Sequence, residues 1–340
     1  MIRVSIIGAT GYTGGELIKL LLRHPRVHIS MLTSQSNAGK KISDIHVFLK
    51  GKCDIVCRKF QLDKLIHNSD VIFSCLPHGA VVEHAKHMLK GNKILIDLSA
   101  DFRLKDAAEY KKWYMFTHKA QDLLSEAVYG LSELNRKNLK KAQLIANPGC
   151  YATACLLSLA PIIKSKSVVL DSIIIDAKSG VSGAGRKLNL LYHFAEANEN
   201  VLAYKVAEHR HIPEIEQELS LLANHEVKIT FVPHLIPLDR GIMVTCYTRL
   251  SKKMKADSIY KMYKDFYSGE PFIQVLPLGE FPTVKAVLNT NNCWIGLKLV
   301  EKTRELIIIG VLDNLLKGAS GQAVQNMNIA CGFQETVALL

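Results

Sequence analysis

One cysteine, Cys150, lies where a Pro-Gly turn gives way to an apolar run of helical character over residues 152–163. At the N-terminus of a helix, the free N–H groups and the macrodipole favour the thiolate over the thiol. A thiolate is the nucleophilic form of cysteine and can carry an acyl group as a covalent intermediate. An inert cysteine buried in a turn is the alternative interpretation, and the motifs described next favour the nucleophile.

Two histidines, His209 and His211, precede a segment with helical periodicity, and Pro213 suits the first turn of that helix. The residue before a proline is pushed toward extended geometry, and in an extended segment residues two apart point the same way. The alternation therefore does not choose between the two histidines. Near a thiolate, either one can hold it as an ion pair and move protons at neutral pH. A surface or capping role is the alternative for each.

A glycine-rich loop over residues 8–17 follows the first expected strand and opens the first expected helix. Its glycines recur with G-x-x-G-x-x-G spacing, a variant of the dinucleotide fingerprint, which combines a tight turn, a close approach to pyrophosphate and a helix dipole. A strand-to-helix turn without a ligand is the alternative. The cofactor-binding candidates in this loop are Gly8, Thr10, Gly11, Tyr12, Thr13 and Gly14.

The end of the second expected strand bears on the choice of cofactor. NAD-specific sites usually place Asp or Glu there for the ribose 2'-hydroxyl, whereas this chain has Ser34 and Gln35. Because no carboxylate stands there to repel a 2'-phosphate, the sequence favours NADP. Hydroxyl groups and a lysine from Lys40 or Lys41 would be its partners, although those lysines are otherwise ordinary solvated loop residues.

Two further expected strands end in polar turns, where a doubly wound sheet binds its ligand. One strand leads into a turn with Leu76, Pro77 and His78, which we expect to contact the cofactor. The alternative is a polar turn that binds no ligand. The other leads to Arg103, whose planar guanidinium suits a phosphate or a carboxylate.

Residues 178–186 have a composition suited to a backbone nest around an anion, with three glycines, two serines and cations at both ends. Arg240, after a proline-flanked strand, is a weaker candidate for another anion site. Each of these loops taken alone is more often an ordinary structural loop than a binding site. Three such candidates in one chain are more than we expect from structural loops alone. The substrate-binding candidates in the 178–186 loop are Lys178, Ser179 and Arg186.

The elements that position these residues fall into two patterns. Residues 1–149 alternate strand-like runs with helix-like segments, which predicts a Rossmann-type, doubly wound parallel sheet of the α/β class. Longer strands with wider spacing follow from residue 171, which predicts an α+β domain with helices on one face of a mixed or antiparallel sheet. A last helix over residues 314–331 is a candidate to return to the first domain. The expected strands are residues 2–7, 27–33, 71–76, 93–98, 172–177, 227–232, 242–250, 293–300 and 306–312. The expected helices are residues 14–24, 81–89, 213–224 and 255–267.

Composition describes an ordinary globular chain of 340 residues, 48% of them apolar, long enough for two domains. We expect no signal peptide, because a strand-like run follows Met1 at once, and no membrane span, because the longest apolar stretches are too short. We expect no metal site, because the eight cysteines are scattered and Cys53 and Cys57 have no second pair at metal-site spacing. Reduced thiols indicate a cytoplasmic protein. The net charge of +12 is dispersed, which argues against nucleic acid and is compatible with small polyanions.

These motifs resemble the N-acetyl-gamma-glutamyl-phosphate reductase family of arginine biosynthesis, related to aspartate-semialdehyde dehydrogenase. The resemblance runs through nearly the whole chain, and its most specific part is the segment 313–326. It implies an NADP-binding domain of residues 1–149 plus 313–340, and a catalytic, substrate and oligomerisation domain of residues 150–312. It also implies a catalytic Cys150, with His209 as acid/base and His211 as the alternative. Further residues implied in cofactor binding are Ser182, Gly183 and Asn314, and one further residue implied in substrate binding is Asn147.

The resemblance implies a reaction as well: reductive dephosphorylation of N-acetyl-L-glutamyl 5-phosphate to the 5-semialdehyde through a cysteine thioester, with release of inorganic phosphate. A homo-oligomer, dimer or tetramer, is expected. Ser132 and Ala152 stand where relatives usually have proline, and neither change removes a reacting group. The alternatives are a reductase for the N-acetyl-aminoadipyl phosphate, one methylene longer, and a non-catalytic NADP sensor, against which the thiol and the histidines both argue.

Overall fold

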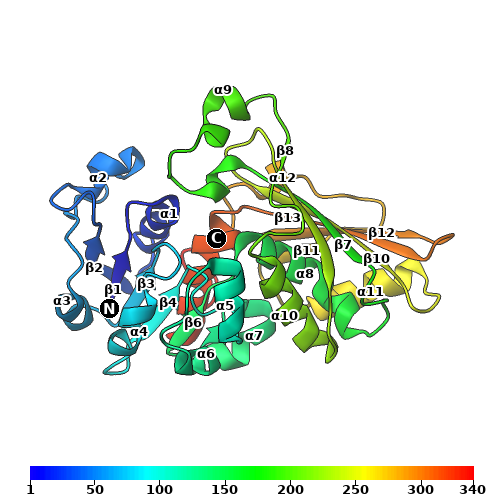
Figure 1. The fold of residues 1–340 in the computed structure, drawn as a ribbon, viewed down its shortest axis with the longest axis horizontal. Coiled ribbons are helices and arrows are strands. Elements are labelled where there is room, and N and C mark those ends of the chain that lie inside the picture. Colours follow the sequence, from blue (N-terminus) through cyan, green and yellow to red (C-terminus); the bar gives the residue numbers. More distant parts are fainter. The chain divides into compact units, whose positions relative to one another are not determined.

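A computed structural model describes residues 1–340, and the contacts within the chain group them into two compact units. The first unit comprises Met1–Gly149 and Ala319–Leu340, and the second comprises Cys150–Gly318 (Figure 1). The chain thus returns to the first unit at Ala319 rather than at residue 313. The reason is that Asn314 still belongs to the second unit, where its Oδ1 accepts a hydrogen bond of 2.6 Å from the N–H of Gly241.

The first unit is built on a six-stranded sheet in which every pair of neighbours is parallel, in the order β2-β1-β3-β4-β6-β5. The central strands are almost continuously apolar and buried on both faces, as parallel sheets covered by helices require. The predicted doubly wound α/β architecture is confirmed. The strands are β1 (Ile2–Ile7), β2 (Val27–Thr33), β3 (Val71–Ser74), β4 (Ile94–Asp97), β5 (Val128–Tyr129) and β6 (Leu144–Ala146).

Helices of the first unit connect these strands, and the C-terminal helix joins them. α13 (Gly321–Ala330) is buried over nearly its whole length and packs against α1 (Tyr12–Leu21) and α7 (Ser132–Leu139) of this unit. Its start differs from the prediction, because Leu316–Ser320 forms a π-helix first. The remaining helices are α2 (Ile42–Ile45), α3 (Leu62–His67), α4 (Val82–Met88), α5 (Ala107–Tyr114), α6 (Asp122–Glu126) and the 3-10 turn Val47–Leu49.

The second unit is built on a seven-stranded mixed sheet in the order β11-β12-β13-β10-β7-β9-β8, which confirms the predicted α+β class. β10 pairs antiparallel with both β7 and β13, whereas β7 and β9 are parallel. The strands are β7 (Ile173–Ser179), β8 (Leu202–Ala203), β9 (Ile229–Leu235), β10 (Ile242–Arg249), β11 (Ile273–Val275), β12 (Cys293–Val300) and β13 (Glu305–Leu312). The helices are α8 (Cys150–Lys164), α9 (Phe194–Ala197), α10 (Ile212–Ala223), α11 (Ala256–Phe266) and α12 (Val284–Val287), with 3-10 turns at Val181–Ala184 and Leu190–Tyr192.

α8 is the central helix of this unit and carries Cys150 as its first residue. Its residues from Tyr151 to Ile163 are all buried, because it packs against β10, β13, α10 and α11 on different sides. A glycine in the sheet permits this close approach: a Cβ built on Gly310 would lie 2.1 Å from the Oγ of Ser158. No helix in the structure is both long and apolar enough to cross a membrane.

Candidate active site

Cys150 begins α8 directly after the turn Pro148-Gly149, as the sequence predicted, and its side chain is half-buried. The position places the thiol at the positive end of a buried 15-residue helix, where the dipole stabilises a thiolate. The backbone of Gly318 lies against it, since a Cβ built on Gly318 would be 2.8 Å from the Cβ of Cys150. Any larger residue at position 318 would displace the nucleophile.

An aromatic cluster surrounds the residue that follows the nucleophile. The ring of Tyr151 makes edge-on contacts with those of His209 and His211, at centroid distances of 5.6 and 5.9 Å. Its hydroxyl donates to the carbonyl of His234 at 3.2 Å and accepts from the hydroxyl of Tyr204 at 3.4 Å. Burial is the main cause that raises the pKa of both tyrosines, and the nearby Cys150 raises the pKa of each further. Both phenols therefore stay protonated and can donate hydrogen bonds.

The two histidines meet in a turn rather than in the extended segment that the sequence predicted. The N–H of Ile212 donates to the carbonyl of His209 at 2.9 Å, and His211 has right-handed helical geometry as the N-cap of α10. The extended preference of a residue before proline is overridden because α10 begins there. The two rings consequently contact each other, with centroids 4.7 Å apart.

The protonation of His209 is fixed by its surroundings. Its Nδ1 accepts a hydrogen bond of 3.1 Å from the backbone N–H of His211. Burial lowers the pKa of His209 to about 2, and the neighbouring His211, Lys205 and Arg210 lower it further. The imidazole is therefore neutral at physiological pH, and its hydrogen resides on Nε2, which makes Nε2–H a hydrogen-bond donor.

The glycine-rich loop has the shape that a bound pyrophosphate needs. Gly8 has a φ of +76°, and a Cβ there would lie 2.7 Å from the carbonyl oxygen of Cys75. A Cβ on Gly14 would lie 2.5 Å from the carbonyl oxygen of Ala9, so both glycines are sterically required. A Cβ on Gly11, in contrast, would make an ordinary contact, 3.7 Å from the carbonyl oxygen of Gly8, and Gly11 is the N-cap of α1, without a side-chain cap. The first turn of α1 thus offers backbone N–H groups to an anion.

At the end of β2 the predicted ribose-binding residues lie beside this loop. The hydroxyl of Ser34 is 3.2 Å from that of Thr10, and it accepts a hydrogen bond of 3.2 Å from the N–H of Asn37. Gln35 is exposed. After β3, Nδ1 of His78 accepts a hydrogen bond of 3.0 Å from the N–H of Ala100, which fixes the loop 76–78.

Arg103 and Asn147, predicted to bind substrate, are both buried and make structural hydrogen bonds in the first unit. Nε of Arg103 donates to the carbonyl of Asn147 at 2.8 Å, and Nη2 donates to that of Leu98 at 2.8 Å. The side-chain amide of Asn147 donates to Ala319 O and accepts from Asn326 Nδ2. These contacts fix the turn that leads into Cys150.

The loop after β7 is a compact nest in the second unit. Lys178 forms an ion pair of 2.5 Å with Asp176, and the hydroxyl of Ser179 donates to the carbonyl of Gly180. Ser182 accepts a hydrogen bond of 3.0 Å from the side-chain amide of Asn314, so these two predicted cofactor-binding residues do meet. Gly183 and Arg186 are exposed beyond them.

Arg240, the weaker anion-site candidate, is engaged inside the second unit. Its Nη1 donates to Asp313 Oδ2 at 3.3 Å and to the side-chain oxygen of Asn289 at 3.1 Å. The carboxylate of Asp313 is buried and also accepts the N–H groups of Asn289 and Leu315. The Arg240 guanidinium thus neutralises a buried carboxylate, which is a structural role.

Comparison with known proteins identifies the family. Residues 3–142 match a family model described as semialdehyde dehydrogenase, NAD binding domain, and residues 150–314 match semialdehyde dehydrogenase, dimerisation domain. An N-acetyl-gamma-glutamyl-phosphate reductase of Pelotomaculum thermopropionicum is 50% identical over 338 residues, 99% of this chain and 97% of that protein. One from Clostridium botulinum is 47% identical over 339 residues, 100% of this chain and 98% of that protein. The chain belongs to the N-acetyl-gamma-glutamyl-phosphate reductase family.

Solved structures share the fold at much lower identity. Aspartate semialdehyde dehydrogenase II of Vibrio cholerae, complexed with ASA, gives a TM-score of 0.75 at 16% identity and covers 98% of both chains. Aspartate semialdehyde dehydrogenase of Candida albicans, solved with NADP, gives 0.70 at 16% identity over 97% of this chain and 98% of that one. The reductase family and these dehydrogenases therefore share one two-domain architecture, with a nicotinamide cofactor domain.

Two buried carboxylates of the first unit escaped the sequence analysis. Asp97, the last residue of β4, accepts the hydroxyl of Ser99 at 2.6 Å, and Asp101 accepts the N–H of Gly79 at 2.6 Å. Burial is the main cause that raises the pKa of both, and repulsion from Asp101 helps to raise that of Asp97 to about 7. Only the fold could reveal this pair, because the sequence shows neither that both carboxylates are buried nor that they lie close together.

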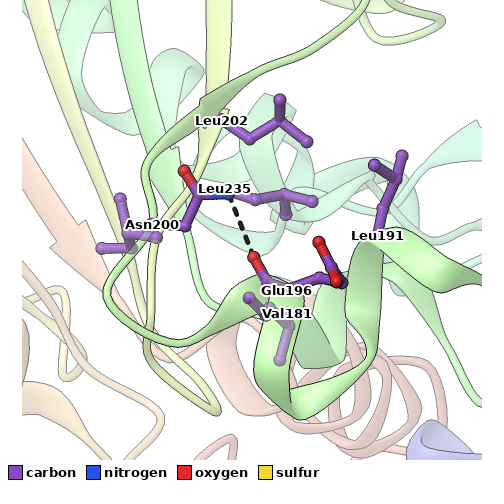
Figure 2. Close-up of a pocket in the computed structure, with 8 residues that line it drawn as sticks. Val181, Leu191, Glu196, Asn200, Leu202 and Leu235 are labelled. Carbon is purple, nitrogen blue, oxygen red and sulfur yellow. Dashed lines mark hydrogen bonds between the residues drawn. The ribbon is translucent and has the colours of Figure 1, made fainter.

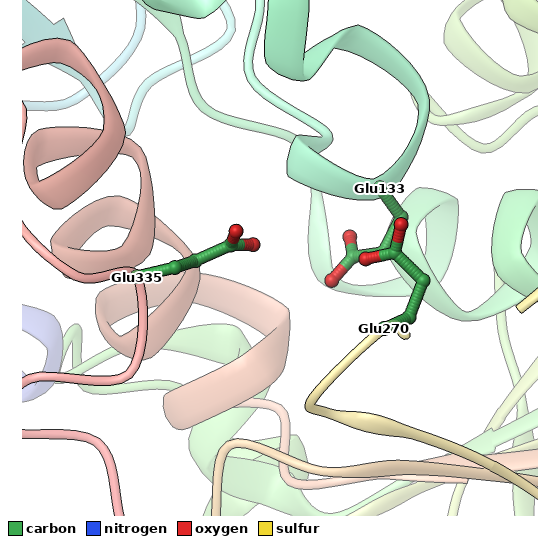
Figure 3. A group of neighbouring side chains, drawn as sticks. All are labelled: Glu133, Glu270 and Glu335. Atoms are coloured by element: carbon green, nitrogen blue, oxygen red, sulfur yellow. The ribbon is translucent and has the colours of Figure 1, made fainter. Parts of the chain in front are cut away.

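A buried polar network on α13 was also missed. Asn326 donates to the carbonyl of Gly130 at 2.7 Å and to Asn147 Oδ1 at 3.0 Å, and it accepts from the hydroxyl of Ser132 at 2.8 Å. Further along, Gln325 donates to two carboxylates shown in Figure 3, Glu133 and Glu335. The network gives structural roles to Gln325 and Asn326, two polar residues of the segment 313–326.

A cavity of about 60 Å³ lies in the second unit and is lined by residues of α9, β8 and β9 and of the loops beside them (Figure 2). Six of its eight lining residues are apolar, and the side chain of Asn200 donates to the carbonyl of Glu196 at 3.0 Å beside it. Neither Cys150 nor a histidine lines it. Room for about two water molecules is too little for a dinucleotide, so this cavity is not the cofactor site. The lining residues are Val181, Leu191, Glu196, Ala197, Asn200, Leu202, Leu235 and Ile236.

Proposed function

We propose that the chain catalyses NADPH-dependent reduction of N-acetyl-L-glutamyl 5-phosphate to N-acetyl-L-glutamate 5-semialdehyde, with release of inorganic phosphate. The observation that carries this proposal is the nucleophile: Cys150 at the N-terminus of α8, followed by the protonated Tyr151, whose ring contacts the neutral His209. Its membership of the reductase family supplies the substrate. In a cell the reaction belongs to arginine biosynthesis in the cytoplasm.

The thiolate of Cys150 attacks the acyl carbonyl, and the carbon–oxygen bond to phosphate breaks, which leaves a thioester and phosphate. The bound nicotinamide cofactor supplies the hydride that reduces this thioester to a thiohemiacetal oxyanion. Collapse of that oxyanion expels the Cys150 thiolate and forms the aldehyde. The one proton consumed overall ends on the departing phosphate.

His209 is the histidine that we propose for this reaction, with His211 as the alternative. As a neutral Nε2–H donor, His209 stabilises the oxyanions that form on the carbonyl oxygen, an effect often worth a few kcal/mol of barrier. The thiol proton is lost earlier, because the helix N-terminus favours the thiolate before substrate reacts. Lys178, Ser179 and Arg186 remain the proposed contacts of the substrate, and Arg103 and Asn147 support the turn before Cys150.

The proposed cofactor is NADP rather than NAD. The glycine loop, with Gly11 as the N-cap of α1, fits a pyrophosphate. Ser34 stands where NAD-specific sites place a carboxylate, and residues 34–41 contain no acid. The remaining proposed cofactor contacts are Gly8, Thr10, Tyr12, Thr13, Gly14, Gln35, Leu76, Pro77, His78, Ser182, Gly183 and Asn314.

Self-association through the seven-stranded sheet is also proposed, because the family model names residues 150–314 a dimerisation domain. α8 and α10 pack against this sheet on the side of the buried residues. On the opposite side, Ile174, Tyr247 and Ile307 stand in one row across β7, β10 and β13 and stay partly exposed. A partly exposed apolar row of this kind suits contact with a second copy.

The deciding assay runs the reaction backward on the purified full chain, with NADP, phosphate and N-acetylglutamate semialdehyde. Phosphate-dependent NADP reduction is expected, with kcat/KM at least about 10-fold above that for the homologue one carbon longer. Preference for the longer homologue would reassign the substrate. Absence of turnover with both aldehydes, in a preparation that binds NADPH, would refute the proposed enzyme.

A further inference from the structure

The C-terminal end of β2 is extended by a short segment that carries Arg58. The N–H of Arg58 donates to the carbonyl of Leu32 at 2.9 Å, and the N–H of Ser34 donates to the carbonyl of Arg58 at 3.0 Å. Arg58 thus pairs with Thr33 as a parallel bridge at the edge of the sheet. These bonds to the residues on either side of Thr33 place the backbone of Arg58 next to the end of β2, where a dinucleotide site distinguishes the 2'-hydroxyl from the 2'-phosphate.

The loop that follows Ser34 is fastened to the same segment. The N–H of Gly39 donates to the carbonyl of Cys57 at 2.8 Å, and the N–H of Cys57 donates to the carbonyl of Lys40 at 2.9 Å. These hydrogen bonds bring the backbone of Arg58 close to that of Ser34 and Lys40, although Arg58 is far from both in the sequence. Two backbone hydrogen bonds of Cys57, one donated and one accepted, hold this arrangement.

Three cations lie in this region, Lys40, Lys41 and Arg58, and only Lys41 has an acidic partner in the protein. Lys41 forms an ion pair of 3.1 Å with Asp54, which also accepts the hydroxyl of Ser43 at 2.6 Å. Arg58 and Lys40 are exposed, and neither forms an ion pair or a side-chain hydrogen bond. Lys41 is therefore neutralised, whereas Arg58 keeps its full set of donors for an anion.

We propose that Arg58 binds the 2'-phosphate of NADP and is the main determinant of the preference for NADP over NAD, an inference that rests on the cofactor named in the proposed function. The guanidinium fork matches phosphate oxygens bidentately, and Lys40 adds positive charge at the same place. Sequence analysis pointed to Lys40 or Lys41 for this role. The structure assigns it to Arg58 because Lys41 is paired with Asp54.

The test is isothermal titration calorimetry of the full chain with NADPH and NADH, compared for wild type, Arg58→Ala and Lys59→Ala. Lys59 is the matched control, because it loses the same charge from the next residue, which points to the other side of an extended segment. Arg58→Ala is expected to weaken NADPH binding about 10-fold or more and NADH binding less than about 2-fold. Lys59→Ala should change neither by more than about 2-fold.

Binding of 2',5'-ADP against that of ADP provides a second readout that needs no nicotinamide. Loss of the 2',5'-ADP preference in Arg58→Ala alone supports the inference. If wild type prefers NADPH and Arg58→Ala keeps that preference, Arg58 is not the determinant, and the proposed cofactor stands. If wild type binds NADPH and NADH equally, the proposed cofactor choice fails, and the role of Arg58 fails with it.

Discussion

The backbone N–H of His211 donates a hydrogen bond to Nδ1 of His209, and this single contact decides which proton His209 can offer. With Nδ1 occupied as an acceptor and the pKa lowered to about 2, the neutral ring presents Nε2–H. A neutral ring of this kind stabilises an oxyanion and does not titrate near neutral pH. The sequence analysis assigned acid/base chemistry to His209, and this geometry supports the proposal that the ring acts by hydrogen-bond donation instead.

Replacing His209 with Asn should therefore lower kcat by roughly 100-fold or more without changing the shape of the pH–rate profile between pH 6 and 8. Because the pKa of His209 is lowered, no limb near neutrality belongs to it. Steady-state rates at several pH values measure both quantities. His211→Asn is the comparison variant, with a smaller loss expected. A larger loss for His211→Asn would reverse the assignment. Disappearance of a limb near pH 6.5 in His209→Asn would show that His209 titrates there and is not a neutral donor.

Cys150→Ser should abolish turnover while NADPH binding stays within about 2-fold of wild type. A serine hydroxyl is a far poorer nucleophile at neutral pH, and the glycine loop of the first unit is a separate binding element. Turnover and calorimetric binding are measured on the same preparation. The matched control is Cys331→Ser, a half-buried cysteine of the first unit, which should keep activity. Retention of more than about a tenth of the activity by Cys150→Ser would exclude a covalent nucleophile.

Asp97 makes a prediction about pH and stability. Its pKa is raised to about 7 in the folded chain, from 3.8 as the ordinary value, chiefly by burial. Between these values the folded state binds more protons than the unfolded state, so stability falls as pH rises through that window. Asp97→Asn, which cannot ionise, should therefore gain stability relative to wild type at pH 8 compared with pH 5. Thermal melts at both pH values test this, and an equal difference at both would contradict it.

The partly exposed row of Ile174, Tyr247 and Ile307 on the seven-stranded sheet leads to a prediction about self-association. Ile307→Glu puts a charge between Tyr247 and Lys298 on that row and should reduce the molar mass of the native particle, measured by light scattering, to half or less. Leu221→Glu, at an exposed apolar position on α10, is the control and should leave the mass unchanged. A far-UV spectrum shows that both variants are folded. An unchanged mass for a folded Ile307→Glu would move the interface elsewhere.

The sequence predicted the elements whose signal is local. β1 and β2 have the predicted bounds, because a short run rich in apolar residues between turn residues is typical of a parallel strand. Cys150 begins its helix because glycine and proline end the preceding turn. Short strands such as β5 and β8 contain two residues each, too few to show a period.

The remaining features depend on contacts between distant residues. The turn at His209 and His211 overrides a local preference because α10 starts there. Arg58 lies in a segment with no periodicity and acquires a role only through its hydrogen bonds to Leu32 and Ser34. Asp97 ends β4, and Asp101 lies in the loop that follows. The fold buries both carboxyl groups close to each other, and their spacing in the sequence does not reveal this. Pairwise tertiary contacts of this kind leave no signal in one sequence.

The hydrogen bonds of Asn326, in the segment 313–326, lead to a prediction about stability. Its amide bonds to Gly130, Ser132 and Asn147 within the first unit, and all of these partners are buried. Asn326→Ala leaves two carbonyl-type acceptors without this donor, at about 1–3 kcal/mol for each buried group. The melting temperature should therefore fall by roughly 5–10 °C. Asn138→Ala, at an exposed position on α7, is the matched control and should melt within about 1 °C of wild type. Calorimetry or circular dichroism measures both melts, and equal melting of Asn326→Ala and wild type would mean that the network contributes nothing to stability.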